Sequence, residues 1–187
     1  LIAPLLVVPA CGTLPGQNPT IVFDSTSHGH LLEPAFMTQV FTSSDLNTAD
    51  VYLTDIPGLG TPEAKGEGMT GNILYIHMFL YPKAGQTPID FTASNTTITH
   101  VVVANGAYGV YAGAGFLLPS NKPNKGSTFK GHMADATMMP VSATSGFDDL
   151  LGWNELSGSI NAKRNDDRAE EIREFLGAIL ANPNLAP

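Results

Sequence analysis

Apolar residues recur along most of this chain in short runs that suit β-strands. The run at 72–81 is apolar or aromatic at both odd and even positions, which predicts a central strand covered on both faces. Residues 96–104 are rich in Thr and Val, and Asn105-Gly106 follows at once. Because Asn-Gly favours a two-residue hairpin turn, residues 107–118 are predicted to be the return strand.

Weaker patterns predict further strands on either side of this hairpin. The return strand carries three glycines, at 109, 113 and 115, which indicate a bulge or a close approach of two backbones. Residues 127–141 are expected to hold one or two short strands. The remaining candidates are short β-rich runs at 20–23, 35–42, 49–56 and 156–162.

One segment has the period of an amphipathic helix, at 167–181. Asp167 and Glu170 have the spacing of a capping box at its start, and Asn182-Pro183 ends it. Its apolar positions fall on one face and predict packing on the domain or on a partner; they are Ala169, Ile172, Leu176, Ile179 and Leu180.

These elements predict a mainly β protein. We expect an antiparallel β-sandwich, immunoglobulin-like or related, with one C-terminal amphipathic helix; a barrel is the alternative. Residues 20–187 are interpreted as a single domain. Residues 1–19 are interpreted as an apolar signal or anchor segment followed by a Gly/Pro-rich linker.

The apolar N-terminal run ends at the only cysteine of the chain, Cys11. The segment Val8-Pro9-Ala10-Cys11 resembles the end of a bacterial lipoprotein signal, although Pro9 departs from that pattern. The resemblance implies lipid attachment at Cys11 and a location in the bacterial cell envelope, on the periplasmic face of a membrane. An uncleaved apolar anchor, or an apolar strand with a buried cysteine, are the alternatives.

The net charge of the chain argues against some classes of binding partner. The chain has 17 acidic and 9 basic residues and a formal net charge of −8, which argues against nucleic-acid binding and against electrostatic docking on anionic lipid. A single cysteine excludes an internal disulfide and a zinc site built from cysteines. Contact with a membrane is therefore expected through the N-terminus.

Two groups of residues could ligate a metal. His28-Gly29-His30, close to Glu33, offers imidazole ligands that suit Zn or Cu. His132-Met133 offers an imidazole and a thioether, a combination that suits copper. The competing interpretation is a polar loop and ordinary strand residues, so we expect no obligatory cofactor, with Cu or Zn as the alternative.

No catalytic motif stands out. The chain has no G-x-S-x-G sequence. Asp148-Asp149 is interpreted as part of a short turn that packs aromatic residues. The leading hypothesis is a non-enzymatic, membrane-tethered accessory or scaffold subunit of a larger membrane protein complex, with a respiratory or photosynthetic complex as a plausible host. The alternatives are an envelope lipoprotein that binds a metal or a small molecule and, third, a hydrolase.

Overall fold

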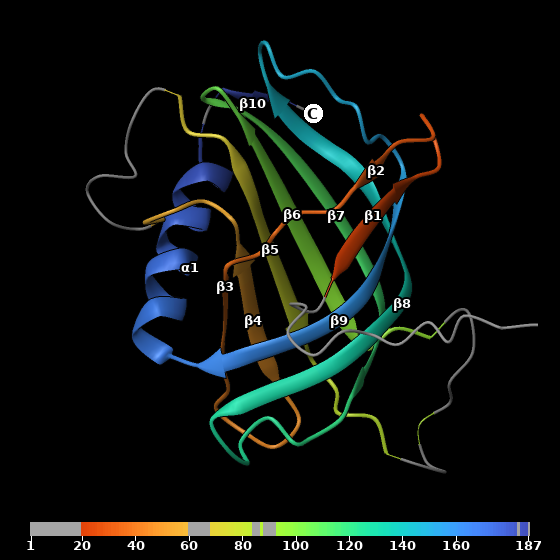
Figure 1. Ribbon diagram of the computed structural model, residues 1–187, viewed down its shortest axis with the longest axis vertical. Coiled ribbons are helices and arrows are strands. Elements are labelled where there is room, and N and C mark those ends of the chain that lie inside the picture. The colour runs from red at the N-terminus through yellow and green to blue at the C-terminus, as the bar shows by residue number, and fades with distance from the viewer. Residues whose placement is uncertain (1–19, 60–67, 84–86, 88–92, 183, 187) are drawn as a thin grey trace, which may run out of the picture.

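The computed structural model describes residues 20–59, 68–83, 87, 93–182 and 184–186 (Figure 1). This part of the chain is mainly β, with a single helix near its C-terminal end, which confirms the predicted class. The elements are β1 (Ile21–Ser25), β2 (Leu31–Leu32), β3 (Thr38–Thr42), β4 (Ala49–Thr54), β5 (Gly71–Met78), β6 (Thr96–Ala104), β7 (Ala107–Pro119), β8 (Thr128–Thr144), β9 (Asn154–Arg164), α1 (Asp166–Leu180) and β10 (Leu185–Ala186).

All ten strands belong to one sheet, and this sheet closes on itself. Strands β3 to β8 pair in the order β3-β4-β5-β6-β7-β8, and β9 joins β8 on one edge to β1 and β3 on the other. The pairing of β3 with β9 is parallel, whereas every other pairing is antiparallel. The described strands thus form the closed sheet of a barrel, and the expected sandwich of two facing sheets is corrected.

The length of β8 and β9 explains this difference. The sequence pattern predicted short strands there, but β8 has 17 residues and β9 has 11. A register shift between Met133 and Ala136, with Asp135 at a φ of 53°, bends β8. Because β8 is long and bent, it pairs with β7 along one edge and with β9 along the other. Strand β9 in turn reaches β3, and this pairing closes the sheet.

The glycines of β7 leave room for the bend of the neighbouring strand, β8. A Cβ on Gly113 would lie 2.0 Å from the carbonyl oxygen of Thr137 on β8, so only glycine fits there. Register shifts interrupt the pairing of β7 with β8 at two places. The prediction of a bulge or a close backbone approach in this strand is confirmed.

Side chains alternate between two apolar layers. The inward side chains fill the closed sheet and include Phe23, Phe41, Leu74, Phe129 and Leu156. The outward side chains of β3 to β7, among them Val40, Tyr52 and Ile73, form a second layer with α1, which lies along the outside of the sheet (Figure 1). The interior and the helix interface are therefore separate cores.

Helix α1 begins close to its expected start, but its cap differs from the prediction. Asn165 is the N-cap, and its side chain accepts a hydrogen bond of 3.0 Å from the backbone N–H of Arg168. Glu170 pairs instead with Arg173, so the predicted capping box with Asp167 does not form. The predicted apolar face is buried except for Leu180, which is exposed.

Within the described ranges, none of the helices combines the length and the apolar character needed to span a bilayer.

Candidate functional site

A loop of residues 145–153, here called the mouth loop, folds over one open end of the closed sheet. It joins β8 to β9 and passes beside β2 at the upper right of Figure 1. The Ser25 hydroxyl donates to the carbonyl of Leu151 at 2.5 Å, and the backbone N–H of Trp153 donates to the Ser27 hydroxyl at 3.0 Å. These contacts fix the loop to the end of β1.

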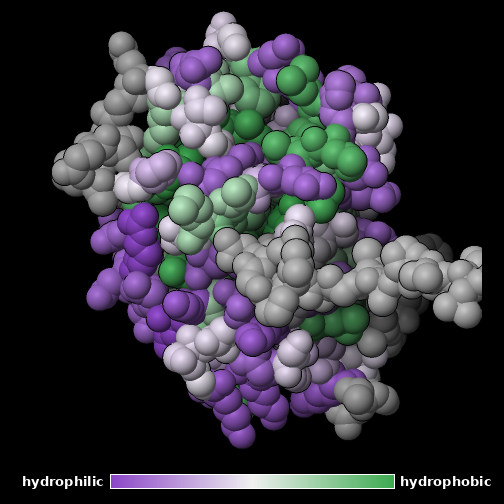
Figure 2. Space-filling view, in the orientation of Figure 1, coloured by the Kyte–Doolittle hydropathy of each residue, from purple (hydrophilic) through white to green (hydrophobic). Residues whose placement is uncertain are grey.

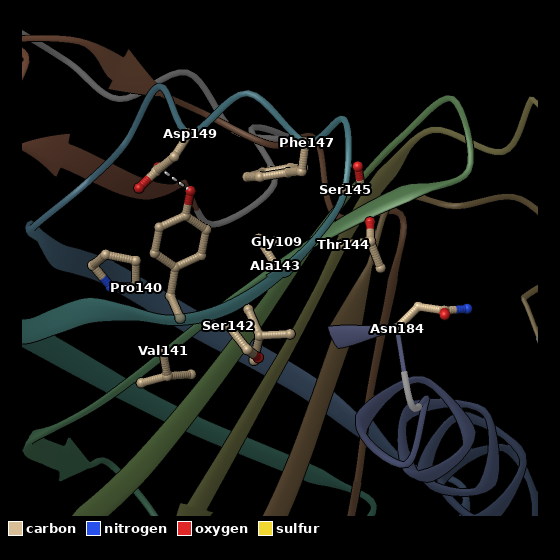
Figure 3. A pocket seen from close by; sticks show the side chains of 12 residues that line it. Gly109, Pro140, Val141, Ser142, Ala143, Thr144, Ser145, Phe147, Asp149 and Asn184 are labelled. Atoms are coloured by element: carbon tan, nitrogen blue, oxygen red, sulfur yellow. Dashed lines mark hydrogen bonds between the residues drawn. The ribbon is translucent and has the colours of Figure 1, made fainter. Parts of the chain in front are cut away.

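Asp149 organises the mouth loop from within. Its Oδ1 accepts hydrogen bonds from the backbone N–H of Leu151 at 3.0 Å and of Gly152 at 2.8 Å, and from the hydroxyl of Tyr111 (Figure 3). Burial, and then the bond to this carboxylate, raise the pKa of the Tyr111 phenol well above its usual value. Tyr111 therefore stays protonated and acts as a fixed donor that ties the loop to β7.

Phe147 anchors the other part of the loop against β7. A Cβ on Gly109 would lie 2.1 Å from Cε1 of Phe147, so the ring rests directly on the glycine backbone. Any larger residue at position 109 would push the ring away from the sheet.

Two cavities flank these anchors and share Tyr111 and Phe147. The cavity between β7, β8 and the loop, drawn in Figure 3, has a volume of about 470 Å³. The second, here called the mouth cavity, has a volume of about 360 Å³ and lies between β2, β6, β7 and the loop. It is lined by Leu31, Leu32, Val102, Ala104, Tyr111, Phe147, Leu150 and Leu151, with His30 and Asp148 as its polar members.

The rim of the mouth cavity is apolar and exposed. The exposed fractions are 65% for Leu31 and 58% for Leu150, which both line the cavity. Trp153, at the end of the mouth loop and outside this lining, is 53% exposed. Hydrophobic side chains gather at the upper right of Figure 2, where Figure 1 places β2 and the mouth loop. Exposed apolar side chains that gather around an apolar cavity are a common feature of binding surfaces, whereas scattered apolar surface residues need no explanation.

The predicted metal ligands do not converge. His28 and His30 are exposed near the mouth, and His30 lines the mouth cavity. His132 is exposed on β8 whereas Met133 is fully buried in the core, because neighbouring strand residues face opposite sides. Within the part of the chain that the structure covers, no three His, Cys, Asp or Glu side chains form a group able to hold a metal ion. Cys11, the predicted lipid attachment site, lies outside the described residues.

A polar cluster that the sequence did not indicate lies on the outer face of β4 and β5. His77 Nδ1 lies 2.8 Å from Oδ1 of Asp50, and the Tyr75 hydroxyl donates to the same oxygen at 2.7 Å. Burial, and then this hydrogen bond, raise the pKa of Tyr75 far above its usual value. Direct register pairing of Asp50 with His77 brings the groups together, and no local sequence signal marks it.

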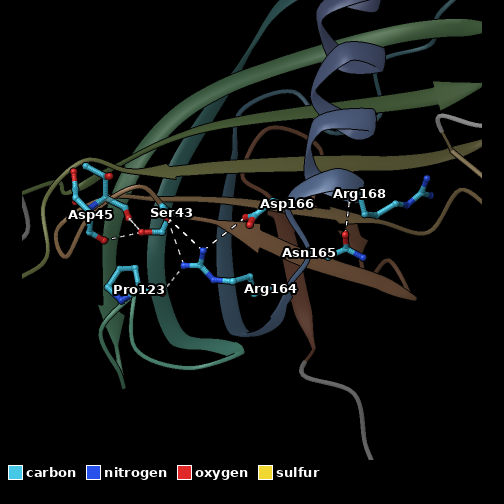
Figure 4. Close-up of polar contacts among 8 residues, drawn as sticks. Ser43, Asp45, Pro123, Arg164, Asn165, Asp166 and Arg168 are labelled. Atoms are coloured by element: carbon cyan, nitrogen blue, oxygen red, sulfur yellow. Dashed lines mark hydrogen bonds and ion pairs between the residues drawn. The ribbon is translucent and has the colours of Figure 1, made fainter.

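The opposite end of the sheet is held by Arg164 (Figure 4). Its guanidinium donates to the carbonyls of Ser43 at 3.5 Å and Pro123 at 3.3 Å, and it lies 5.2 Å from the ring centre of Phe41. It also lies 3.8 Å from Asp166 at the start of α1. Arg164 thus joins two loops and the helix, which is a structural role.

Comparisons with protein-family models, with curated proteins and with solved structures found no match to this chain.

Sequence reasoning missed the role of Tyr111, Asp149 and Phe147, because their contacts join strands and loops that are distant in sequence. The interpretation of Asp148-Asp149 as a turn that packs aromatic residues agrees with the loop, in which Phe147 and Asp149 contact β7.

Proposed function

We propose that this protein binds a small, neutral and mostly apolar molecule in the mouth cavity. The observation that carries the proposal is the apolar cavity of about 360 Å³ at the open end of a closed sheet. Ligand sites favour such places, and this volume lies near the lower end of their usual range of roughly 300–1,000 Å³. The proposal adopts small-molecule binding, one of the alternatives that the sequence left open.

The lining of the cavity restricts the charge of the ligand. Its walls are mostly Leu, Val, Ala, Tyr and Phe side chains, with His30 and Asp148 as the polar members, and none of the described residues that line it is Lys or Arg. A charged group would lose its hydration among these apolar walls, which is costly, and an anion would find no lysine or arginine there as a counter-ion. The preferred ligand is therefore uncharged.

Binding can be tested with N-phenyl-1-naphthylamine, a neutral fluorescent probe whose emission rises when it leaves water. We expect saturable binding to the wild-type protein. Ala104→Phe fills the cavity from its wall and should weaken binding at least tenfold. Ala114→Phe, the same change at an exposed position of the neighbouring strand β7, should leave binding unchanged. Binding that does not saturate, or equal effects of the two variants, would refute the proposal.

A second candidate function is the accessory-subunit role predicted from the sequence. The exposed side chains of Leu31 and Leu150 at the cavity rim, and of Trp153 at the end of the mouth loop, favour it, because apolar and aromatic groups concentrate at the centres of protein interfaces. Co-purification from a mild detergent extract tests it: a partner should be retained by the wild-type protein and lost on Leu150→Ser. A wild-type protein that elutes alone would contradict this role. The envelope location and the membrane tether stay predictions.

A further inference from the structure

His100 is a fully buried polar residue directly below the mouth cavity. Its ring stacks on Phe23, with ring centres 4.1 Å apart. It pairs in register with Tyr111 on β7, and Val102 follows two positions later on the same inward face of β6. Tyr111 and Val102 both line the mouth cavity, so His100 lies one side-chain layer beneath its floor.

A chain of hydrogen bonds fixes which nitrogen of His100 carries the proton. The Asn72 side-chain N–H donates to Oδ2 of Asp55 at 2.9 Å, which orients the amide so that its oxygen faces the imidazole. Oδ1 of Asn72 lies 3.1 Å from Nε2 of His100. Because an amide oxygen can only accept, Nε2 must be the protonated nitrogen, and Nδ1 carries the free lone pair.

That lone pair has no partner among the described residues, although Nδ1 is buried. Burial lowers the pKa of His100 to about 3, so the ring is neutral and cannot present a second N–H. A neutral acceptor, oriented by Asp55 and Asn72, is therefore held close to an apolar cavity. A buried acceptor without a donor is unfavourable and is relieved by any donor that reaches it.

We propose that His100 is the polar anchor of the ligand, and that its Nδ1 accepts a hydrogen bond from a hydroxyl or N–H group whose apolar body fills the mouth cavity. This inference rests on the proposed function and names the ligand class: neutral molecules with one donor, such as alcohols, phenols or amides. Val102 and Tyr111, which line the cavity, are the side chains that lie between the cavity and His100. Carboxylates are disfavoured, because a carboxylate offers no donor to this nitrogen.

Two isomers isolate the effect of the donor. 1-Octanol and heptyl methyl ether have the same atoms, but only the alcohol can donate. Each is used to displace N-phenyl-1-naphthylamine from the wild-type protein. One hydrogen bond to a buried acceptor should make the alcohol effective at a concentration about three- to tenfold lower than the ether. Octanoate should be the weakest of the three.

The variant His100→Phe retains a ring to stack on Phe23 and removes the acceptor, so the preference for the alcohol should vanish while the ether still displaces the probe. His132→Phe, the same change at an exposed position of β8, should keep the preference. Long-range ¹⁵N–¹H NMR of the histidine-labelled wild-type protein gives a test without a variant, in which octanol shifts the Nδ1 resonance of His100 and the ether does not.

The outcomes separate the two proposals. If the probe binds but the two isomers displace it equally, or if octanol leaves the His100 resonance unchanged, the anchor is refuted and the cavity stands. If the probe does not bind the wild-type protein at all, the proposed function falls and the anchor falls with it.

Discussion

Burial of a neutral histidine makes the stability of this protein depend on pH in a defined window. The pKa of His100 falls from 6.5 in an open chain to about 3 in the folded protein, because burial disfavours the charged ring. Between these two values the unfolded chain binds a proton that the folded protein does not. The free energy of unfolding therefore decreases as the pH falls from about 6.5 toward 3, and this contribution is fully retained above that window.

The size of the effect follows from the two pKa values. At pH 7 roughly a quarter of the unfolded imidazole is protonated, and at pH 5 nearly all of it is, whereas the folded ring stays neutral at both. The linkage relation then gives a loss of about 2 kcal/mol from His100 alone between pH 7 and pH 5. This is a large share of the total stability of a typical domain.

Urea unfolding at pH 7 and pH 5 measures this contribution through the variant His100→Gln. Glutamine does not titrate, so the variant should lose about 2 kcal/mol less than the wild-type protein over this interval. Comparing two proteins across the same interval cancels the contributions of the other groups. The control His132→Gln makes the same substitution at an exposed position of β8 and should follow the wild-type protein.

Parallel behaviour of the wild-type protein and His100→Gln would refute the reasoning. It would mean that His100 takes up a proton in the folded state, and hence that water reaches the layer beneath the mouth cavity.

Three further substitutions test other parts of the structure. Gly109→Ala places a methyl group within 2.1 Å of Phe147, so it should cost about 1–3 kcal/mol in urea unfolding and weaken probe binding severalfold. Gly177→Ala makes the same change on an exposed part of α1 where nothing lies within 4 Å of the new Cβ, and it should raise stability by about 0.5–1 kcal/mol; a loss would contradict the assigned helix. Asn165→Ala removes the N-cap of α1 and should lower the thermal midpoint by the equivalent of about 0.5–2 kcal/mol, whereas no change would place the cap elsewhere.

The sequence predicted the elements whose signals are local. The hairpin at Asn105-Gly106 joins β6 and β7 as expected, because the turn type and the β-branched run before it are encoded in neighbouring residues. The helix was found to within one residue at each end for the same reason. Its cap was assigned to Asp167 rather than Asn165, since several acceptors near a helix start compete for the same role.

Closure of the sheet could not be predicted in this way. It depends on the bend of β8 at Asp135 and on the parallel pairing of Val40 and Phe41 with the end of β9, contacts between residues more than a hundred positions apart. A left-handed conformation at an aspartate leaves little trace in a hydrophobic pattern. One or two short strands were therefore expected where one long, bent strand forms.

The candidate site was hidden for a related reason. Alternation along residues 96–104 does place His100 on the same face as Ile98 and Val102, which is a signal for a buried histidine. Its orientation by Asn72 and Asp55 appears only once β5 and β6 are paired. The metal prediction relied on residues close in sequence, and neighbours such as His132 and Met133 face opposite sides of a strand.

The location of the ligand tests the central claim most directly. Amide chemical shifts of the ¹⁵N-labelled wild-type protein, followed by NMR during titration with N-phenyl-1-naphthylamine, report which residues the probe contacts. We predict that the largest changes occur at Val102, Ala104, Tyr111, Phe147 and Leu151, the residues around the mouth cavity. Changes confined to α1, or to the end of the sheet held by Arg164, would contradict the claim that the mouth cavity is the binding site.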